Sequence, residues 1–140
     1  MKSAFMSELF HAAVARRPMI VPTGGGATVW VMSATCAAAN LLHAAQMAAP
    51  AAGVRRAFTL PALRVSMQSL VDAIVRHTGC DAALFRFEAD EQLEGQFGRL
   101  PPQRTTIADG LGFRHDGSLD VLVVRALRDA GYGEAVHAGT

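Results

Sequence analysis

The sequence has few charged side chains, few aromatic residues and a single lysine, Lys2. Charged residues make up 18% of the 140 positions and hydrophobic residues 51%, and 13 basic against 12 acidic side chains leave a formal net charge of +1. A chain this apolar is not typical of intrinsic disorder. Balanced charge also gives no electrostatic reason to bind nucleic acid or an anionic membrane surface. We therefore expect a globular protein with no nucleic-acid partner and no membrane partner.

Cysteine is scarce as well. Cys36 and Cys80 cannot form a scaffold of several disulfides, so they predict reduced thiols and a cytoplasmic location. Charged residues interrupt the N-terminal region where a signal peptide would need an apolar run, so we expect no leader. The longest charge-free stretch, 18–54, is long enough to span a bilayer, but a run of three glycines and several polar residues argue against a transmembrane helix.

Hydrophobic periodicity predicts a mixture of helices and strands. Helices are expected over 4–16, 35–49, 67–78, 90–97, 106–111 and 119–130, and strands over 19–21, 28–32, 57–60 and 83–87. Ser66 and Ser118 are predicted N-caps, and Gly79 and Gly131 are predicted stops. The pattern predicts one compact α/β unit over residues 1–130, followed by a flexible tail over 131–140.

The helix expected over 35–49 has an apolar and a polar side. Ala38, Leu41, Leu42 and Ala45 share one face, which we expect to be buried. Asn40, His43 and Gln46 form the other edge, which we expect to face solvent.

Three patterns resemble functional sites but favour structural interpretations. Gly24-Gly25-Gly26 leads into a strand rather than a helix and no lysine follows it, so a β-turn is favoured over a phosphate loop. His77-x-x-Cys80 has no second ligand pair at motif spacing, so no metal site is predicted. Cys36 and His43 would lie roughly 10 Å apart along one helix, which is too far for a nucleophile and its base.

Arg104 has an unusual setting. It follows Pro101-Pro102 and precedes the helix expected over 106–111. An arginine presented there can form a forked pair with a carboxylate or phosphate. The alternative is an ordinary surface charge.

Three stretches together resemble one family. They are WVMS (30–33) leading to ANLLHAA (39–45), FTLPALRVS (58–66), and LGFRHDGSLD (111–120). In this order and spacing they resemble the C-terminal portion of extended short-chain dehydrogenases, the NAD-dependent epimerase/dehydratase family, and within it the D-erythronate dehydrogenase-like group. The resemblance runs from about Phe5 to Leu127.

The resemblance implies a substrate-binding lobe plus the last strand and helix of a Rossmann-type domain, here 57–60 and 67–78, without the N-terminal nucleotide-binding half. The complete enzyme would oxidise a hydroxyl group by hydride transfer to NAD. The family's cofactor glycines and its catalytic Tyr-x-x-x-Lys are absent from this sequence, where Val136 stands four residues after the only tyrosine. Without the cofactor glycines we expect this chain alone to bind no NAD. Without the Tyr-x-x-x-Lys pair, which supplies the acid/base group, we expect it to be non-catalytic.

The resemblance also implies substrate-binding residues. Arg104 falls where many relatives have an arginine facing the substrate, and Trp30 and Ser33 match the strand end that borders the substrate cleft. Thr28 stands where an arginine is expected, and Ala34-Thr35 replace the acidic start common in sugar-nucleotide epimerases. These departures favour a small hydroxy acid over a nucleotide-sugar.

Three hypotheses follow. The chain is the C-terminal piece of such a dehydrogenase, or a stand-alone non-catalytic α/β protein that binds a partner or oligomerises, or a subunit completed by a Rossmann half on another chain. The first predicts exposed apolar faces over 57–60 and 67–74, whereas a self-sufficient domain buries them.

Overall fold

The computed structural model describes residues 5–47, 59–97 and 102–136. The helices are α1 (Phe5–Ala15), α2 (Ala34–Gln46), α3 (Met67–Thr78), α4 (Glu91–Phe97), α5 (Thr106–Gly110) and α6 (Leu119–Asp129), with 3-10 turns η3 (Ala82–Leu84) and η4 (Gly133–Ala135). The strands are β1 (Met19–Val21), β2 (Thr28–Val31), β3 (Leu63–Ser66) and β4 (Phe85–Phe87). The predicted α/β class is confirmed.

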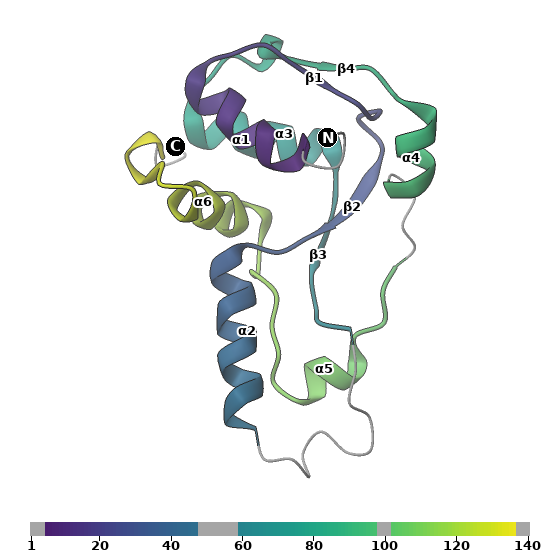
Figure 1. Cartoon of the computed structure of the whole chain (residues 1–140), viewed down its shortest axis with the longest axis vertical. Coiled ribbons are helices and arrows are strands. Elements are labelled where there is room, and N and C mark those ends of the chain that lie inside the picture. The colour runs from purple at the N-terminus through teal and green to yellow at the C-terminus, as the bar shows by residue number, and fades with distance from the viewer. Residues whose placement is uncertain (1–4, 48–58, 98–101, 137–140) are drawn as a thin grey trace.

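The strands form two separate pairs. β1 and β4 are parallel, with Met19 opposite Phe85, and β2 and β3 are antiparallel, with Val29 opposite Val65. In Figure 1, β2 and β3 connect an upper body, which holds α1, α3 and α6, to a lower extension that holds α2 and α5. The glycine run forms the predicted turn before β2, with the Ala27 N–H donating to the Gly24 carbonyl (3.2 Å).

The strand predicted over 57–60 is wrong where it can be checked. Thr59 and Leu60 are not in a strand, and residues 57 and 58 lie outside the described residues. The strand begins later, after Pro61, because 63–66 alternates in sequence and supplies the hydrogen-bonding partner that β2 needs.

The core lies among α1, α3 and α6. Leu9 of α1, Met67 and Ile74 of α3, and Leu127 of α6 are fully buried there. The boundaries of α3 were predicted from its caps: Ser66 Oγ accepts the N–H of Ser69 (3.1 Å), and the helix stops at a left-handed glycine. Capping of this kind stabilises a helix by about 1 kcal/mol.

The expectation that the apolar face of 67–74 is exposed is wrong. Met67, Leu70, Val71 and Ile74 are at most 3% exposed, because α1 and α6 pack over them. The described chain therefore encloses a hydrophobic core of its own. Its described helices include none long and apolar enough to cross a membrane.

The C-terminal segment is packed rather than frayed up to Val136. Tyr132 and Val136 lie against the core, and the Tyr132 hydroxyl is hydrogen-bonded to Nδ1 of His11 on α1 (2.6 Å). This contact differs from the flexible tail predicted from residue 131. Residues 137–140 lie outside the described part of the chain.

Candidate functional site

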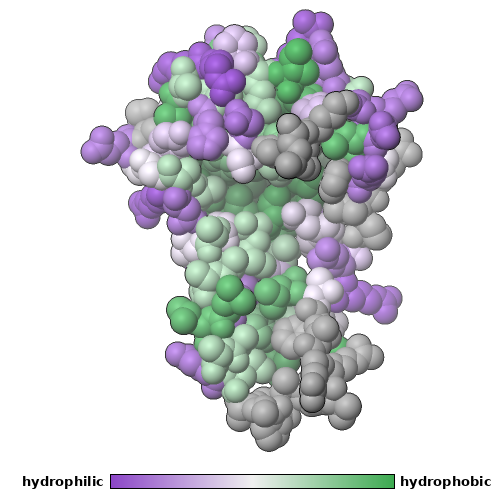
Figure 2. Space-filling view, in the orientation of Figure 1, coloured by the Kyte–Doolittle hydropathy of each residue, from purple (hydrophilic) through white to green (hydrophobic). Residues whose placement is uncertain are grey.

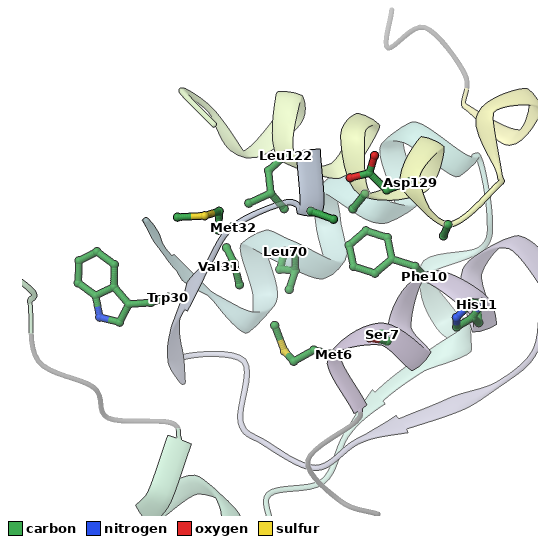
Figure 3. A pocket seen from close by; sticks show the side chains of 13 residues that line it. Met6, Ser7, Phe10, His11, Trp30, Val31, Met32, Leu70, Leu122 and Asp129 are labelled. Carbon is green, nitrogen blue, oxygen red and sulfur yellow. The ribbon is translucent and has the colours of Figure 1, made fainter. Parts of the chain in front are cut away.

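A cavity of about 500 Å³ opens between α1, β2, α3 and α6. Its walls are mainly apolar, and Figure 3 shows Phe10, Leu70 and Leu122 arranged around it. Ser7, His11 and Asp129 add polar groups. This volume is in the range of small-molecule sites in proteins, although the apolar walls do not suit a polyhydroxylated acid.

Two of the polar residues that line the cavity, His11 and Asp129, already have partners. His11 is held by Tyr132 through the hydrogen bond and an edge-on ring contact, with ring centroids 5.4 Å apart. Asp129 accepts the N–H and the hydroxyl of Thr35 at 2.9 and 2.6 Å. The cavity therefore presents fixed polar groups beside an apolar surface.

Of the three predicted substrate residues, one is among those that line the cavity. Trp30 lines the edge of the cavity, and in Figure 3 its ring points away from the other lining side chains. Arg104 is exposed in the loop before α5 and is not among the lining residues. Ser33 lies at the start of α2, outside the cavity lining and 3% exposed.

Ser33 makes structural contacts at the start of α2. Its hydroxyl donates to Oδ1 of Asp116 (2.5 Å) and accepts the N–H of Cys36 (3.1 Å). Its own N–H donates to Oδ2 of Asp116 (2.9 Å). The Ser33 hydroxyl is thus fully engaged in joining α2 to the loop before α6.

Asp116 is the centre of this cluster. Its side chain is completely buried, and Oδ1 also accepts a hydrogen bond from Arg125 (3.0 Å). Burial acts to raise the pKa of Asp116, but the hydrogen bonds from Ser33 and the contact with Arg125 outweigh it and hold the pKa below its usual range. Asp116 therefore stays a carboxylate. Burial raises the pKa of the Cys36 thiol, and the nearby negative charge of Asp116 raises it further. Cys36 is therefore not an activated nucleophile.

The orientation predicted for α2 is wrong. Asn40 is buried, and its side chain bonds the backbone of Arg114 twice, accepting from N–H (3.1 Å) and donating to the carbonyl (2.8 Å). His43 is half-buried and donates from Nε2 to the Leu111 carbonyl (2.6 Å). Asn40 and His43 thus face the loop 111–116, whose backbone groups they satisfy, whereas Gln46 is exposed as predicted.

Gly112 allows this close approach. Its φ is +88°, and an added Cβ would lie 3.1 Å from Nε2 of His43. The His43 ring also packs edge-on against Phe113, with centroids 4.9 Å apart. The Leu-Gly-Phe stretch quoted above therefore has a packing role against α2.

Two features that resemble a dinucleotide site in the sequence or fold do not fit one. The glycine turn precedes a strand, and the first turn of α2 is already occupied by the carboxylates of Asp116 and Asp129, which would repel a pyrophosphate. No group of three His, Cys, Asp or Glu side chains among these residues is placed to hold a metal ion.

The comparisons with known proteins agree with the fold and the resemblance. No family model matches the chain. A curated relative, D-erythronate dehydrogenase from Cupriavidus necator, is 27% identical over 131 residues, which cover 92% of this chain and 40% of the relative. The match to the C-terminal portion of an extended short-chain dehydrogenase is confirmed.

Two solved structures share the fold of this chain. A nucleoside-diphosphate-sugar epimerase from Agrobacterium tumefaciens matches with a TM-score of 0.81 at 20% identity, over 96% of this chain and 40% of that one. A GalE-like L-threonine dehydrogenase from Cupriavidus necator matches with a TM-score of 0.76 at 17% identity, over 92% of this chain and 42% of that one. The chain thus spans about 40% of the length of these proteins.

Sequence reasoning missed the roles of Asp116, Arg125 and Asp129. Asp116 lies within the stretch 111–120, two residues before the N-cap Ser118, so the sequence did place it in the loop before a predicted helix. Its partner Ser33 is 83 residues away, and no local pattern links the two.

Proposed function

We propose that this chain is the C-terminal, substrate-binding part of an NAD-dependent oxidoreductase that acts on a small hydroxy acid such as D-erythronate. The observation that carries the proposal is the coverage: nearly the whole chain corresponds to about 40% of a dehydrogenase in both sequence and fold. The sequence lacks the Tyr-x-x-x-Lys pair, so the chain contributes substrate binding and the acid/base group lies elsewhere.

Arg104 and Trp30 are the proposed substrate contacts. Arg104 is exposed in the loop before α5, where its guanidinium can fork onto a substrate carboxylate. Trp30 offers a partly exposed ring near the end of β2, and this ring points away from the apolar side chains of the cavity. Ser33 acts indirectly, since with Asp116 it fixes the junction between β2 and α2. NAD, when bound in a complete enzyme, supplies the hydride acceptor.

The first test is calorimetric titration of the purified chain with NAD, after its cooperative unfolding has been verified. We expect no heat of binding and no thermal shift, because neither the glycine turn nor the first turn of α2 suits a pyrophosphate. Saturable binding at micromolar NAD would contradict the proposal, since a nucleotide site would then lie within this chain.

Substrate binding is tested in a chimera that joins the N-terminal part of the D-erythronate dehydrogenase to this chain. We expect NAD reduction with D-erythronate, and a rise in KM for Arg104→Ala of about tenfold, the loss of one charge-assisted contact of about 1.5 kcal/mol. Arg86→Ala is the matched control, because Arg86 is an exposed arginine on β4. Equal KM values for the two variants would exclude Arg104 as a ligand.

A second candidate function is a stand-alone protein that binds a partner. The buried apolar face of α3 favours it, because a chain with its own core can fold without a second half. A chimera that folds and binds NAD but shows no hydroxy-acid oxidation would favour this alternative.

A further inference from the structure

Helix α2 presents its apolar side to solvent. Cys36, Asn40 and His43 form an inner stripe against the rest of the chain, and Ala38, Leu41, Leu42 and Ala45 form an outer stripe. The side chains of the outer stripe are exposed, with Leu41 at 68% and Leu42 at 65%. At 3.6 residues per turn the two stripes are centred about 180° apart. Figure 2 shows hydrophobic residues over the lower part of the molecule, where Figure 1 places α2.

The outer stripe is held in a fixed place. Two carboxylates hydrogen-bond to residues at the start of α2. Asp116 accepts hydrogen bonds from the N–H and hydroxyl of Ser33, and Asp129 accepts the same pair from Thr35. Asn40 and His43 then fasten the middle and end of the helix to the loop 111–116. Because the inner stripe uses these specific hydrogen bonds, rotating the helix to bury its leucines would break all of them.

We propose that the outer stripe of α2 is the docking surface for the nucleotide-binding half of the enzyme. This inference rests on the proposed function. The chain spans about 40% of its relatives, so the remaining portion of those proteins, about 60%, is a body larger than this chain and is the occupant we propose. Two adjacent leucines exposed on a rigid helix are the apolar surface that such a body covers.

A second copy of the chain is a poorer occupant. A stable interface involves roughly 20–30 residues a side. Self-pairing through α2 would bring together two narrow stripes of two leucines and two alanines each. The nucleotide-binding half can instead cover this stripe together with neighbouring surfaces.

Cysteine labelling tests the proposal directly. Leu42→Cys and, as a matched control, Val121→Cys each place a thiol at an exposed apolar position, on α2 and α6 respectively, while the native Cys36 and Cys80 are buried. We compare alkylation rates in the isolated chain and in the chimera described above. Docking predicts that labelling at position 42 slows at least tenfold in the chimera while labelling at position 121 changes less than twofold.

Other results overturn the docking surface. Unchanged labelling at position 42, or equal protection at both positions, excludes α2 as the specific contact. Protection in the isolated chain that rises with its concentration assigns the stripe to a second copy instead. NAD binding by the chimera reports that its N-terminal part has folded, and addition of that part as a separate chain provides an independent measurement of the same rates.

The two proposals fail differently. Protection of position 42 without oxidation of D-erythronate retains the docking surface and rejects the substrate. Oxidation of D-erythronate without protection retains the function and rejects the docking surface.

Discussion

Removal of the Asp116 carboxylate should destabilise the chain more than removal of any exposed acid. Asp116→Ala deletes three charge-assisted hydrogen bonds and leaves the buried Ser33 N–H and hydroxyl without their acceptor. Loss of one member of a buried charge pair costs about 3–5 kcal/mol. The partner Arg125 is 39% exposed and can be rehydrated, which favours the lower end, about 3 kcal/mol.

Urea unfolding monitored by Trp30 fluorescence and far-UV circular dichroism measures this loss. Asp129→Ala is the matched control, because Asp129 makes the same paired contact with Thr35 on an exposed surface, and we expect it to cost about 1 kcal/mol. For a domain of this size the Asp116 variant should melt roughly 10 °C lower. Equal losses for the two variants would refute the reasoning that burial makes the Asp116 cluster the stronger contact.

Three further predictions follow from the same contacts. The pKa of Asp116 in the folded chain lies below its unfolded value of about 3.9. Its contribution to stability is therefore fully present above that value and is lost as pH falls through the folded pKa. Below pH ~4, the free energy of unfolding should depend less steeply on pH in Asp116→Asn than in the unchanged chain. Gly112→Ala should cost about 1–3 kcal/mol in chemical denaturation, since φ is +88° and the new Cβ meets His43; no loss would exclude that contact. Tyr132→Phe should lower the free energy of unfolding by about 1 kcal/mol through loss of the hydrogen bond to His11. An unchanged melting temperature would indicate that the segment from residue 131 does not stabilise the fold.

Local signals predicted the helices well. α3 begins after the N-cap Ser66 and ends at the left-handed Gly79, and α6 begins after the N-cap Ser118. Each of these residues forms its capping hydrogen bond with a residue only three or four positions away. The β-branched composition of 28–31 likewise predicted a strand. Its partner was misplaced because pairing joins residues that are 38 positions apart at Thr28 and Ser66, and no short-range pattern fixes that register.

The site was harder to predict because its contacts are long-range and several involve backbone atoms. Asn40 and His43 appear polar in the sequence, but their partners are the Arg114 and Leu111 backbone groups about 70 residues away. A periodicity rule assumes that the apolar stripe of a helix faces the core of its own chain. That assumption fails for α2, where a loop with unsatisfied carbonyl and N–H groups competes for the helix and hydrogen-bonds its polar side.

This failure is itself informative about assembly. Exposure of Leu41 and Leu42 forgoes about 1.5–3 kcal/mol for each leucine that burial would have supplied. The hydrogen bonds of the inner stripe offset part of that loss within the chain, and the proposed docking of a nucleotide-binding half would recover the rest. The periodicity of α2 is therefore the pattern expected of a helix between two layers, one within this chain and, under the docking proposal, one outside it. The same argument explains why α3, whose apolar face is covered by α1 and α6, obeys the rule, while α2 departs from it.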